Sequence, residues 1–340
     1  MSVQSLPAEE VLAPPVMRAE GLTMHFPAGG GFGPFGHKHW IHAVDDVSFD
    51  LRPGRVTALV GESGSGKSTV VRCLAQLYKP TGGSIEFQGR DVTRLRGRRA
   101  LLHYRSQVQM IYQDPFGSLN PVKTVEHHIA RPLKIHHIVP RGKIRDRVVE
   151  LLTEVGLAPA AEFAEKYPHQ LSGGQRQRVA VARTLAVQPT VLLADEPISM
   201  LDVSIRMGIL NLMYELRTKG NIAFLYITHD IASARYIADE VLVMYAGQVV
   251  EQGPTDVVLQ KPLHPYTQLL LSAVPNPEAG IERSVLPTRG GELRAAIDPG
   301  AECRFVSRCP FAMDKCSKAM PQLAEVEPGH WVRCYLYPGS

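Results

Sequence analysis

The stretch "LVGESGSGKSTVVRCLAQL", residues 59–77, passes from an apolar segment through a glycine-rich turn into a helix-like segment that begins with a lysine. Its spacing Gly61-x-x-x-x-Gly66-Lys67-Ser68 fits the template of a phosphate-binding loop. Glycines let several backbone N–H groups converge on one phosphate at the start of a helix. Lys67 adds a positive charge, and the Ser68 hydroxyl is expected to bind Mg²⁺. The residues predicted to form this site are Gly61, Ser63, Gly64, Ser65, Gly66, Lys67, Ser68 and Thr69.

Strand-like and helix-like segments alternate around this loop. Apolar runs predict strands at 56–60, 108–112, 190–194 and 222–228. Helical patterns cover 67–78, 175–187 and 203–218, with further helices within 122–157. This alternation is typical of an α/β domain with a parallel sheet.

Length and charge limit the other possibilities. A chain of 340 residues is longer than one typical domain, and its formal net charge of +4 is mild. The arginines gathered between residues 90 and 105 are interpreted as a solvated helix face, so no nucleic-acid partner is expected. No run of 18 apolar residues and no secretory signal is found, which predicts a cytosolic chain whose membrane role depends on partners.

Two segments have compositions that do not suit a packed core. Residues 1–16, rich in proline, alanine and glutamate, are expected to form a disordered lead. The glycine-rich segment 27–39 is expected to be a mobile loop between two strands.

A second candidate site lies in "TVLLADEP", residues 190–197. Its apolar run delivers Asp195 and Glu196 to the C-terminal end of a strand, where open α/β sheets bind their ligands. Adjacent side chains on a strand point to opposite sides, so the two carboxylates can have different roles. We expect Asp195 to hold Mg²⁺ through water and Glu196 to polarise the attacking water.

The third stretch, "LSGGQRQRVAVARTLAVQP" at residues 171–189, opens a helix with Ser172, Gly173 and Gly174. The N–H groups and dipole of that helix make a second anion site. Together with Gln175, these residues resemble the signature motif of ATP-binding cassette proteins. Further positions resemble the Q-loop, D-loop and switch histidine of that family, namely Gln113 in "IYQDP", Asp202 in "SMLD" and His229 in "YITHD".

This resemblance covers residues 17–255 and implies a P-loop NTPase fold of the ATP-binding cassette type, with a helical subdomain at 114–170. It also implies that the phosphate loop of one subunit and the signature of another enclose one ATP. Gln113 is then a Mg²⁺ ligand, His229 contacts the γ-phosphate, and Asp202 and Gln175 lie at the nucleotide. Phe26 in "LTMHF" falls where the family places its adenine-stacking aromatic, and Trp40 is the rival.

The segment "QKPLHPYTQLLLSAVPNP", residues 260–277, resembles the extension of oligopeptide and dipeptide importer ATPases, whose hallmark is His264-Pro265-Tyr266. The extension is placed at residues 256–340. This implies an ATPase subunit on the cytoplasmic face of the membrane. Its implied partners are a second, non-identical cassette chain, two transmembrane permease subunits and an extracytoplasmic solute-binding protein. Nickel or oligosaccharide importers share the extension, so peptide is the favoured cargo; a soluble cassette ATPase of DNA repair or translation is the other alternative.

Four cysteines lie in the last 40 residues with spacings x5, x6 and x17: Cys303, Cys309, Cys316 and Cys334. Cytosolic thiols stay reduced, so a metal site is expected rather than two disulfides. The spacing is not the C-x2-C of a zinc ribbon. The position of the third cysteine resembles importer subunits that bind an iron–sulfur cluster, which favours [4Fe–4S] over zinc or unmetallated thiols. Because this tail is remote in sequence from Lys67 and Glu196, a structural role or an interface to the partner cassette is expected for it rather than a role in hydrolysis.

Overall fold

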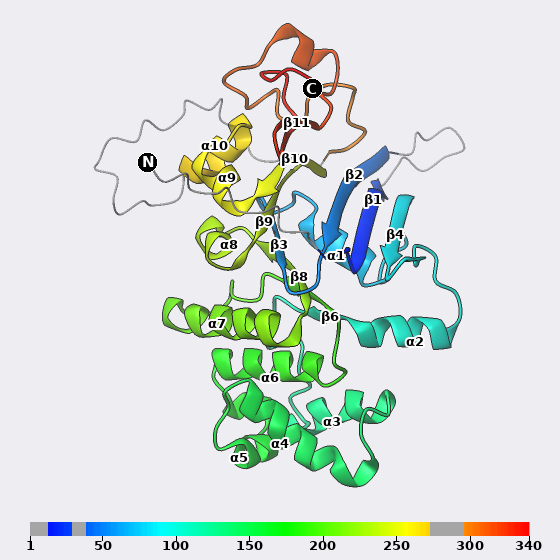
Figure 1. Ribbon diagram of the computed structural model, residues 1–340, viewed down its shortest axis with the longest axis vertical. Helices are drawn as coiled ribbons and strands as arrows, with labels where there is room; N and C mark the ends of the chain where they lie inside the picture. Colours follow the sequence, from blue (N-terminus) through cyan, green and yellow to red (C-terminus); the bar gives the residue numbers. More distant parts are fainter. Residues whose placement is uncertain (1–12, 29–38, 273–295, 340) are drawn as a thin grey trace, which may run out of the picture.

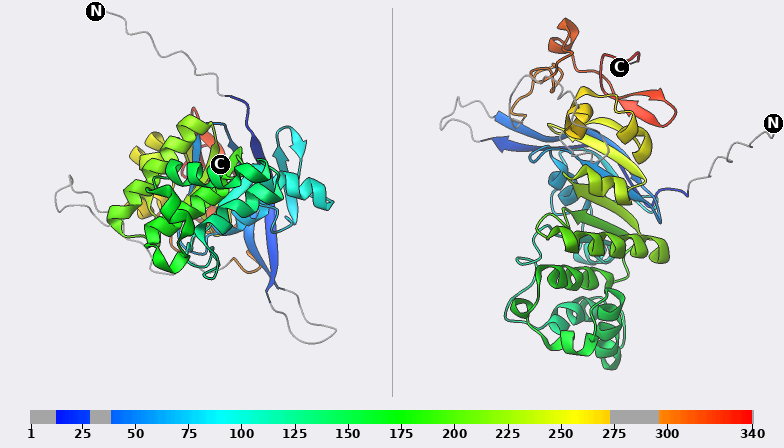
Figure 2. Two further views of the ribbon diagram at one scale, coloured as in Figure 1. Left: turned by 90° about the horizontal axis from the view of Figure 1, so that it is seen from below. Right: turned by 90° about the vertical axis from the view of Figure 1, so that its left-hand side faces the viewer.

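The computed structural model describes residues 13–28, 39–272 and 296–339. The molecule is elongated, with a helical region at one end and the C-terminal tail at the other (Figures 1 and 2). The predicted phosphate-binding loop and the predicted carboxylate site at Asp195 and Glu196 lie between these two ends, at the central sheet.

The central sheet has eight strands in the order β11-β12-β10-β9-β3-β8-β7-β6. Strands β3 (Val56–Val60), β6 (Val108–Ile111), β7 (Val191–Asp195), β8 (Ala223–Thr228) and β9 (Glu240–Tyr245) pair in parallel. Strands β3, β7 and β8 are buried along their whole length, as continuous apolar runs in a parallel sheet require. The four strands predicted from the sequence are confirmed to within one residue at each end, and so is the α/β class.

A second, antiparallel sheet has the order β2-β1-β4-β5 and lies beside α1 (Figure 1). Its strands are β1 (Met17–Ala28), β2 (His39–Leu51), β4 (Gly82–Phe87) and β5 (Arg90–Asp91). The glycine-rich insertion therefore connects two paired strands, although its residues 29–38 lie outside the described residues. Of the predicted disordered lead, residues 1–12 also lie outside them, while the N–H of Val16 donates to the Leu51 carbonyl at 2.8 Å.

Helix α1 (Lys67–Leu74) follows the phosphate loop and ends four residues earlier than predicted. Gln76 adopts a left-handed conformation with φ 54° and donates its N–H to Cys73, while Leu77 donates to Arg72. These two bonds form the C-terminal motif that usually requires glycine after a helix. A glutamine at that position gave no stop signal in the sequence, which is why the predicted helix was too long.

Helix α2 (Arg98–Gln107) contains three of the clustered arginines, and the other three precede it. All six are exposed: Arg90, Arg94, Arg96, Arg98, Arg99 and Arg105. Tyr104 is its main anchor, only 3% exposed, with its hydroxyl donating to the Leu74 carbonyl and its ring edge-on to Phe87. The helix is thus the solvated face that the sequence predicted.

The remaining helices of the cassette pack below and beside the central sheet (Figure 1). Helices α6 (Gly173–Leu185), α7 (Val203–Gly220) and α8 (Ile231–Ile237) lie nearest the sheet. Helices α3 (Val125–Ile135), α4 (Ile144–Glu154) and α5 (Ala160–Glu165), with two short 3₁₀ turns at Arg141–Lys143 and Pro168–Gln170, form the far end of the molecule. Within the described ranges, no helix is both long and apolar enough to cross a membrane.

The C-terminal tail extends the central sheet. Strand β10 (Gln248–Pro254) pairs with β12 (His330–Val332), which pairs in turn with β11 (Ala324–Glu327). Helices α9 (Thr255–Gln260) and α10 (Pro265–Ser272) and a 3₁₀ turn at Asp314–Ser317 complete it. Glu251 on β10 is fully buried and accepts hydrogen bonds from Leu263 N at 2.7 Å, His264 N at 2.9 Å and His330 Nε2 at 2.8 Å. One carboxylate therefore joins β10, β12 and the approach to α10.

Replacing Glu251 by alanine should destabilise the tail, because three buried donors lose their only shared acceptor. Each such loss costs about 1–3 kcal/mol, so we expect a total of at least about 3 kcal/mol in the free energy of unfolding. Glu215→Ala, which breaks an exposed i,i+4 ion pair with Lys219, is the control and should cost about 0.5 kcal/mol or less. Denaturant titration with limited proteolysis of the tail measures both, and equal effects would contradict this role.

Candidate functional site

The loop between β3 and α1 approaches other backbone segments too closely for side chains at two of its glycines. A Cβ on Gly61 would lie 2.2 Å from the Met244 carbonyl oxygen, and one on Gly66 would lie 2.1 Å from that of Ala43. Gly66 also has φ 108°, a conformation that L side chains rarely adopt. The loop can therefore keep this shape only with glycine at both positions.

Lys67 begins α1 and is only 5% exposed. Its ammonium donates to the carbonyl oxygens of Gly61 and Glu62, both at 2.7 Å, and lies 3.4 Å from Ser65 Oγ. Burial lowers the pKa of Lys67, and the carboxylates of Glu196, Asp195 and Glu62 partly offset this shift. The loop thus surrounds one buried cation with oxygen atoms.

The two predicted carboxylates do point in different directions. Asp195, at the end of β7, accepts a hydrogen bond from Ser68 Oγ at 3.0 Å, and burial raises its pKa. Glu196 follows in a left-handed conformation with φ 46°. Its Oε2 accepts a bond from Gln113 Nε2 at 3.1 Å and lies 3.2 Å from His229 Nδ1. Residues from four distant sequence segments thus meet at the ends of β3, β6, β7 and β8.

These residues border an open cavity of about 630 Å³. The predicted site residues that line it are Ser63, Gly64, Gly66, Lys67, Ser68, Thr69, Gln113, Glu196 and His229. The residues of the lining that the sequence did not single out are Ile41, His42, Ala43, Glu62, Ala246, Gly247 and Ala296. Most of them come from β2 and the β9–β10 turn and belong to no motif, so only the folded chain reveals them.

The signature residues lie elsewhere. Ser172 caps α6: its Oγ accepts from Gln175 N at 3.3 Å, and its N–H donates to Gln175 Oε1 at 3.0 Å. Gly174 packs against Ile205, where a Cβ would lie 2.4 Å from that side chain. None of these residues, nor Gly173 or Asp202 at the start of α7, lines the cavity that Lys67 borders. Within one chain, the two predicted anion sites are therefore separate.

Neither candidate adenine-stacking aromatic lines the cavity. The Phe26 ring lies edge-on to Tyr78 with centroids 5.4 Å apart, while Trp40 is 40% exposed. The stacking residue stays a prediction.

The four tail cysteines surround one small apolar cavity, which Phe305, Val306 and Phe311 also line. Cys303 donates its N–H to the Cys316 carbonyl at 2.8 Å, which links two of the cysteine positions through the backbone. Burial raises the pKa of Cys303 and of Cys334 to about 11 each. The structure thus gathers the predicted ligand set: Cys303, Cys309, Cys316 and Cys334.

Comparisons with known proteins agree with this geometry. The chain matches the family described as "ABC transporter" over residues 44–199 and the one described as "Oligopeptide/dipeptide transporter, C-terminal region" over residues 250–316. It is 44% identical over 299 residues to the oligopeptide transport ATP-binding protein AppF of Bacillus subtilis, covering 87% of this chain and 90% of AppF. It is 40% identical over 329 residues to the dipeptide transport ATP-binding protein DppF of Escherichia coli, covering 96% of each chain.

Solved structures show the same fold. The chain resembles the dimeric post-hydrolysis state of the ATP-binding cassette MJ0796 bound to ADP and Pi, with a TM-score of 0.62 and 28% sequence identity. That match covers 70% of this chain and 98% of the other.

Gly66→Ala should disrupt the phosphate loop, because the added methyl group would collide with the Ala43 carbonyl and strain the backbone. We expect ATP binding to weaken by about 10- to 100-fold. Gly142→Ala is the control, since a Cβ there meets no atom within 4 Å. Isothermal titration of each variant with ATP checks the prediction, and wild-type affinity in Gly66→Ala would show that this loop shape is not needed.

Proposed function

The chain belongs to the ATP-binding cassette family of transport proteins, and we propose on this basis that it is the ATP-hydrolysing subunit of a peptide importer. Oligopeptide and dipeptide transport proteins about 40% identical to it match nearly its whole length. The observation that carries the activity is that Lys67, Ser68 and Glu196 line one cavity, with Asp195 hydrogen-bonded to Ser68. ATP with Mg²⁺ is the cofactor pair that such a site serves.

The geometry supports separate roles for the residues of this cavity. The N–H groups of the phosphate loop and the Lys67 ammonium bind and orient the nucleotide phosphates. Ser68, Asp195 and Gln113 supply oxygen atoms suited to Mg²⁺, which balances the charge of the phosphates. Glu196 holds the attacking water and takes its proton, while His229, 3.2 Å from the same carboxylate, faces the γ-phosphate. Phe26 is proposed as the adenine-stacking ring.

The signature residues complete the site of a second cassette chain. Ser172, Gly173 and Gly174 open a helix end that is away from their own chain's cavity; Ser172 is exposed, Gly173 is partly exposed and Gly174 is buried. Such an end attracts phosphate. Gln175 and Asp202 would border the same nucleotide. A head-to-tail pair of cassettes would then close on two ATP molecules, so nucleotide binding and closure stabilise each other. We propose a non-identical cassette as the partner.

The other assignments concern the surroundings of this ATPase. We propose that residues 17–255 form the cassette and that its helical part at 114–170, at the far end of the molecule, receives two transmembrane permease subunits at the cytoplasmic face (Figure 1). An extracytoplasmic solute-binding protein would deliver the peptide. Residues 256–340 form the tail, which the match to the oligopeptide/dipeptide transporter region supports in part.

For the four cysteines we propose a [4Fe–4S] cluster. The four cysteines line one small cavity, and a cluster of this kind takes one thiolate at each of its four iron atoms. Their spacing in the sequence is not the C-x2-C of a zinc ribbon.

Glu196→Gln should retain ATP and lose turnover by about 10²- to 10⁴-fold, because the amide cannot accept the proton of water. Lys67→Ala should instead weaken ATP binding, since the phosphates lose their buried cation. Glu215→Gln on the exposed face of α7 is the matched control and should keep both properties. Steady-state ATPase and nucleotide retention assays separate these outcomes, and undiminished turnover in Glu196→Gln would remove this residue from catalysis.

Protein purified without oxygen should be brown and contain about four iron and four sulfide per chain if the cluster is present. Cys309→Ser should remove the colour and expose the tail to protease, because a metal site supplies cohesion to a small tail. Cys73→Ala, which changes the buried cysteine of α1, should leave the iron content unchanged. About one zinc per chain would assign the site to zinc, and a metal-free but protease-resistant tail would exclude a metal altogether.

A further inference from the structure

Glu62, the second residue of the phosphate loop, is held by two residues of the C-terminal tail. Its N–H donates to the Tyr266 hydroxyl oxygen at 2.8 Å. Its carboxylate accepts two hydrogen bonds from the Arg308 guanidinium, at 2.9 and 3.0 Å. Its carbonyl accepts from the Lys67 ammonium at 2.7 Å. The tail and the phosphate-binding lysine therefore hold different groups of the same residue.

Tyr266 is a rigid support for this contact. It is fully buried on α10, and its ring packs against Tyr245 with centroids 4.6 Å apart and against Phe305 at 5.6 Å. Its own N–H donates to His264 Nδ1 at 3.0 Å. With its ring enclosed and its backbone fixed, the hydroxyl group cannot follow a moving loop. The phenol thus fixes the position of the Glu62 amide.

The Arg308 side chain, like that of Tyr266, is held in place by packing. Its side chain is 12% exposed, and its guanidinium lies 5.7 Å from the centre of the Tyr245 ring and 5.9 Å from that of Phe305. The two parallel bonds to Glu62 have the forked geometry in which arginine binds a carboxylate most strongly. The pair is mostly sheltered from solvent, with 29% of the Glu62 side chain exposed, so screening weakens it less than a surface ion pair.

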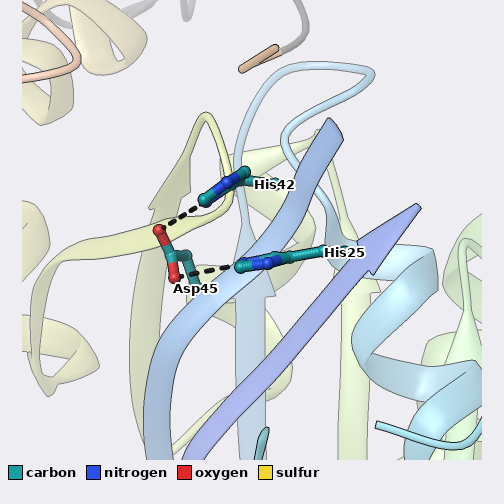
Figure 3. Close-up of side chains that lie close together, drawn as sticks. All are labelled: His25, His42 and Asp45. Atoms are coloured by element: carbon teal, nitrogen blue, oxygen red, sulfur yellow. Dashed lines mark hydrogen bonds and ion pairs between the residues drawn. The ribbon is translucent and has the colours of Figure 1, made fainter. Parts of the chain in front are cut away.

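A second arginine of the same tail segment, residues 303–309, contacts the cassette beside the cavity. Arg304 pairs with the Asp45 carboxylate and donates to the Ala246 carbonyl. Asp45 also contacts His25 Nε2 at 3.4 Å and His42 Nδ1 at 3.2 Å (Figure 3). These three residues are close enough to hold a metal ion. Because the Arg304 cation already pairs with this carboxylate, we interpret the cluster as an anchor for the tail.

We infer that Tyr266 and Arg308 are positioning residues that hold the phosphate loop in its nucleotide-binding shape. The inference rests on the proposed ATPase function and adds to it a role for the tail. Releasing Glu62 would move the carbonyl that orients Lys67, and with it the loop N–H groups that bind phosphate. Glu196 and His229 do not contact Glu62 through any hydrogen bond in the described structure, so ATP affinity should change more than the rate of the chemical step.

The inferred role is structural, as the sequence predicted for a tail remote from Lys67 and Glu196, but it reaches the phosphate loop itself. In the folded protein, Arg308 and Glu62 are 246 positions apart and directly bonded. Sequence distance gave no indication of this contact.

A double-mutant cycle on the full-length protein tests the Arg308–Glu62 contact. Glu62→Gln and Arg308→Gln should each weaken the binding of fluorescent ATP by about tenfold, the size expected for a lost charge-assisted bond. The double variant should lose no more than either single variant. In steady-state assays the KM for ATP should rise while kcat changes little, and Arg308→Lys should recover part of the affinity.

Tyr266→Phe tests the second contact without disturbing the packing of the ring, and it should also weaken ATP binding. Lys261→Gln is the matched control, because it breaks a tail ion pair with Glu327 that does not reach the loop. If Arg308→Gln fails to fold, Glu62→Gln and Tyr266→Phe decide the question. Unchanged ATP affinity in those two variants, or additive losses in the double variant, would overturn the inference alone. A wild-type chain that binds no ATP would overturn the proposed function as well.

Discussion

The buried ammonium of Lys67 imposes the constraint on which the rest of this structure depends. A cation that is only 5% exposed is costly unless oxygen atoms surround it. The carbonyls of Gly61 and Glu62 provide them, which forces the loop to curl tightly over the end of β3. That curl brings Gly61 and Gly66 against neighbouring backbone, and it explains why both must be glycine.

The proposed catalytic groups lie at the same end of the sheet. Because β3, β7 and β8 run in parallel, their carboxyl ends meet at one edge. Ser68, Asp195, Glu196 and His229 come from the segments that follow those ends, so their proximity is a consequence of topology. This part of the site could be predicted from the sequence, since each motif adjoins an apolar strand whose direction is fixed by the fold class.

Other parts could not be predicted, for identifiable physical reasons. Helix α1 ends at a left-handed Gln76, which no residue preference favours. The lining from β2 and the β9–β10 turn depends on how two sheets approach each other, and local sequence does not encode that. The contacts of Tyr266 and Arg308 with Glu62 join positions 204 and 246 apart in the chain, and a single sequence gives no signal for such pairs.

The His264-Pro265-Tyr266 motif acquires a physical explanation from these contacts. Burial lowers the pKa of His264 to about 3, so its ring stays neutral and Nδ1 can accept the Tyr266 N–H. His264 is itself tied to the buried Glu251 carboxylate. A continuous series of hydrogen bonds therefore runs from Glu251 through His264 and Tyr266 to Glu62. Its last bond is the one from Lys67 to the Glu62 carbonyl, so hydrogen bonds connect the tail motif to the cation that we propose binds phosphate.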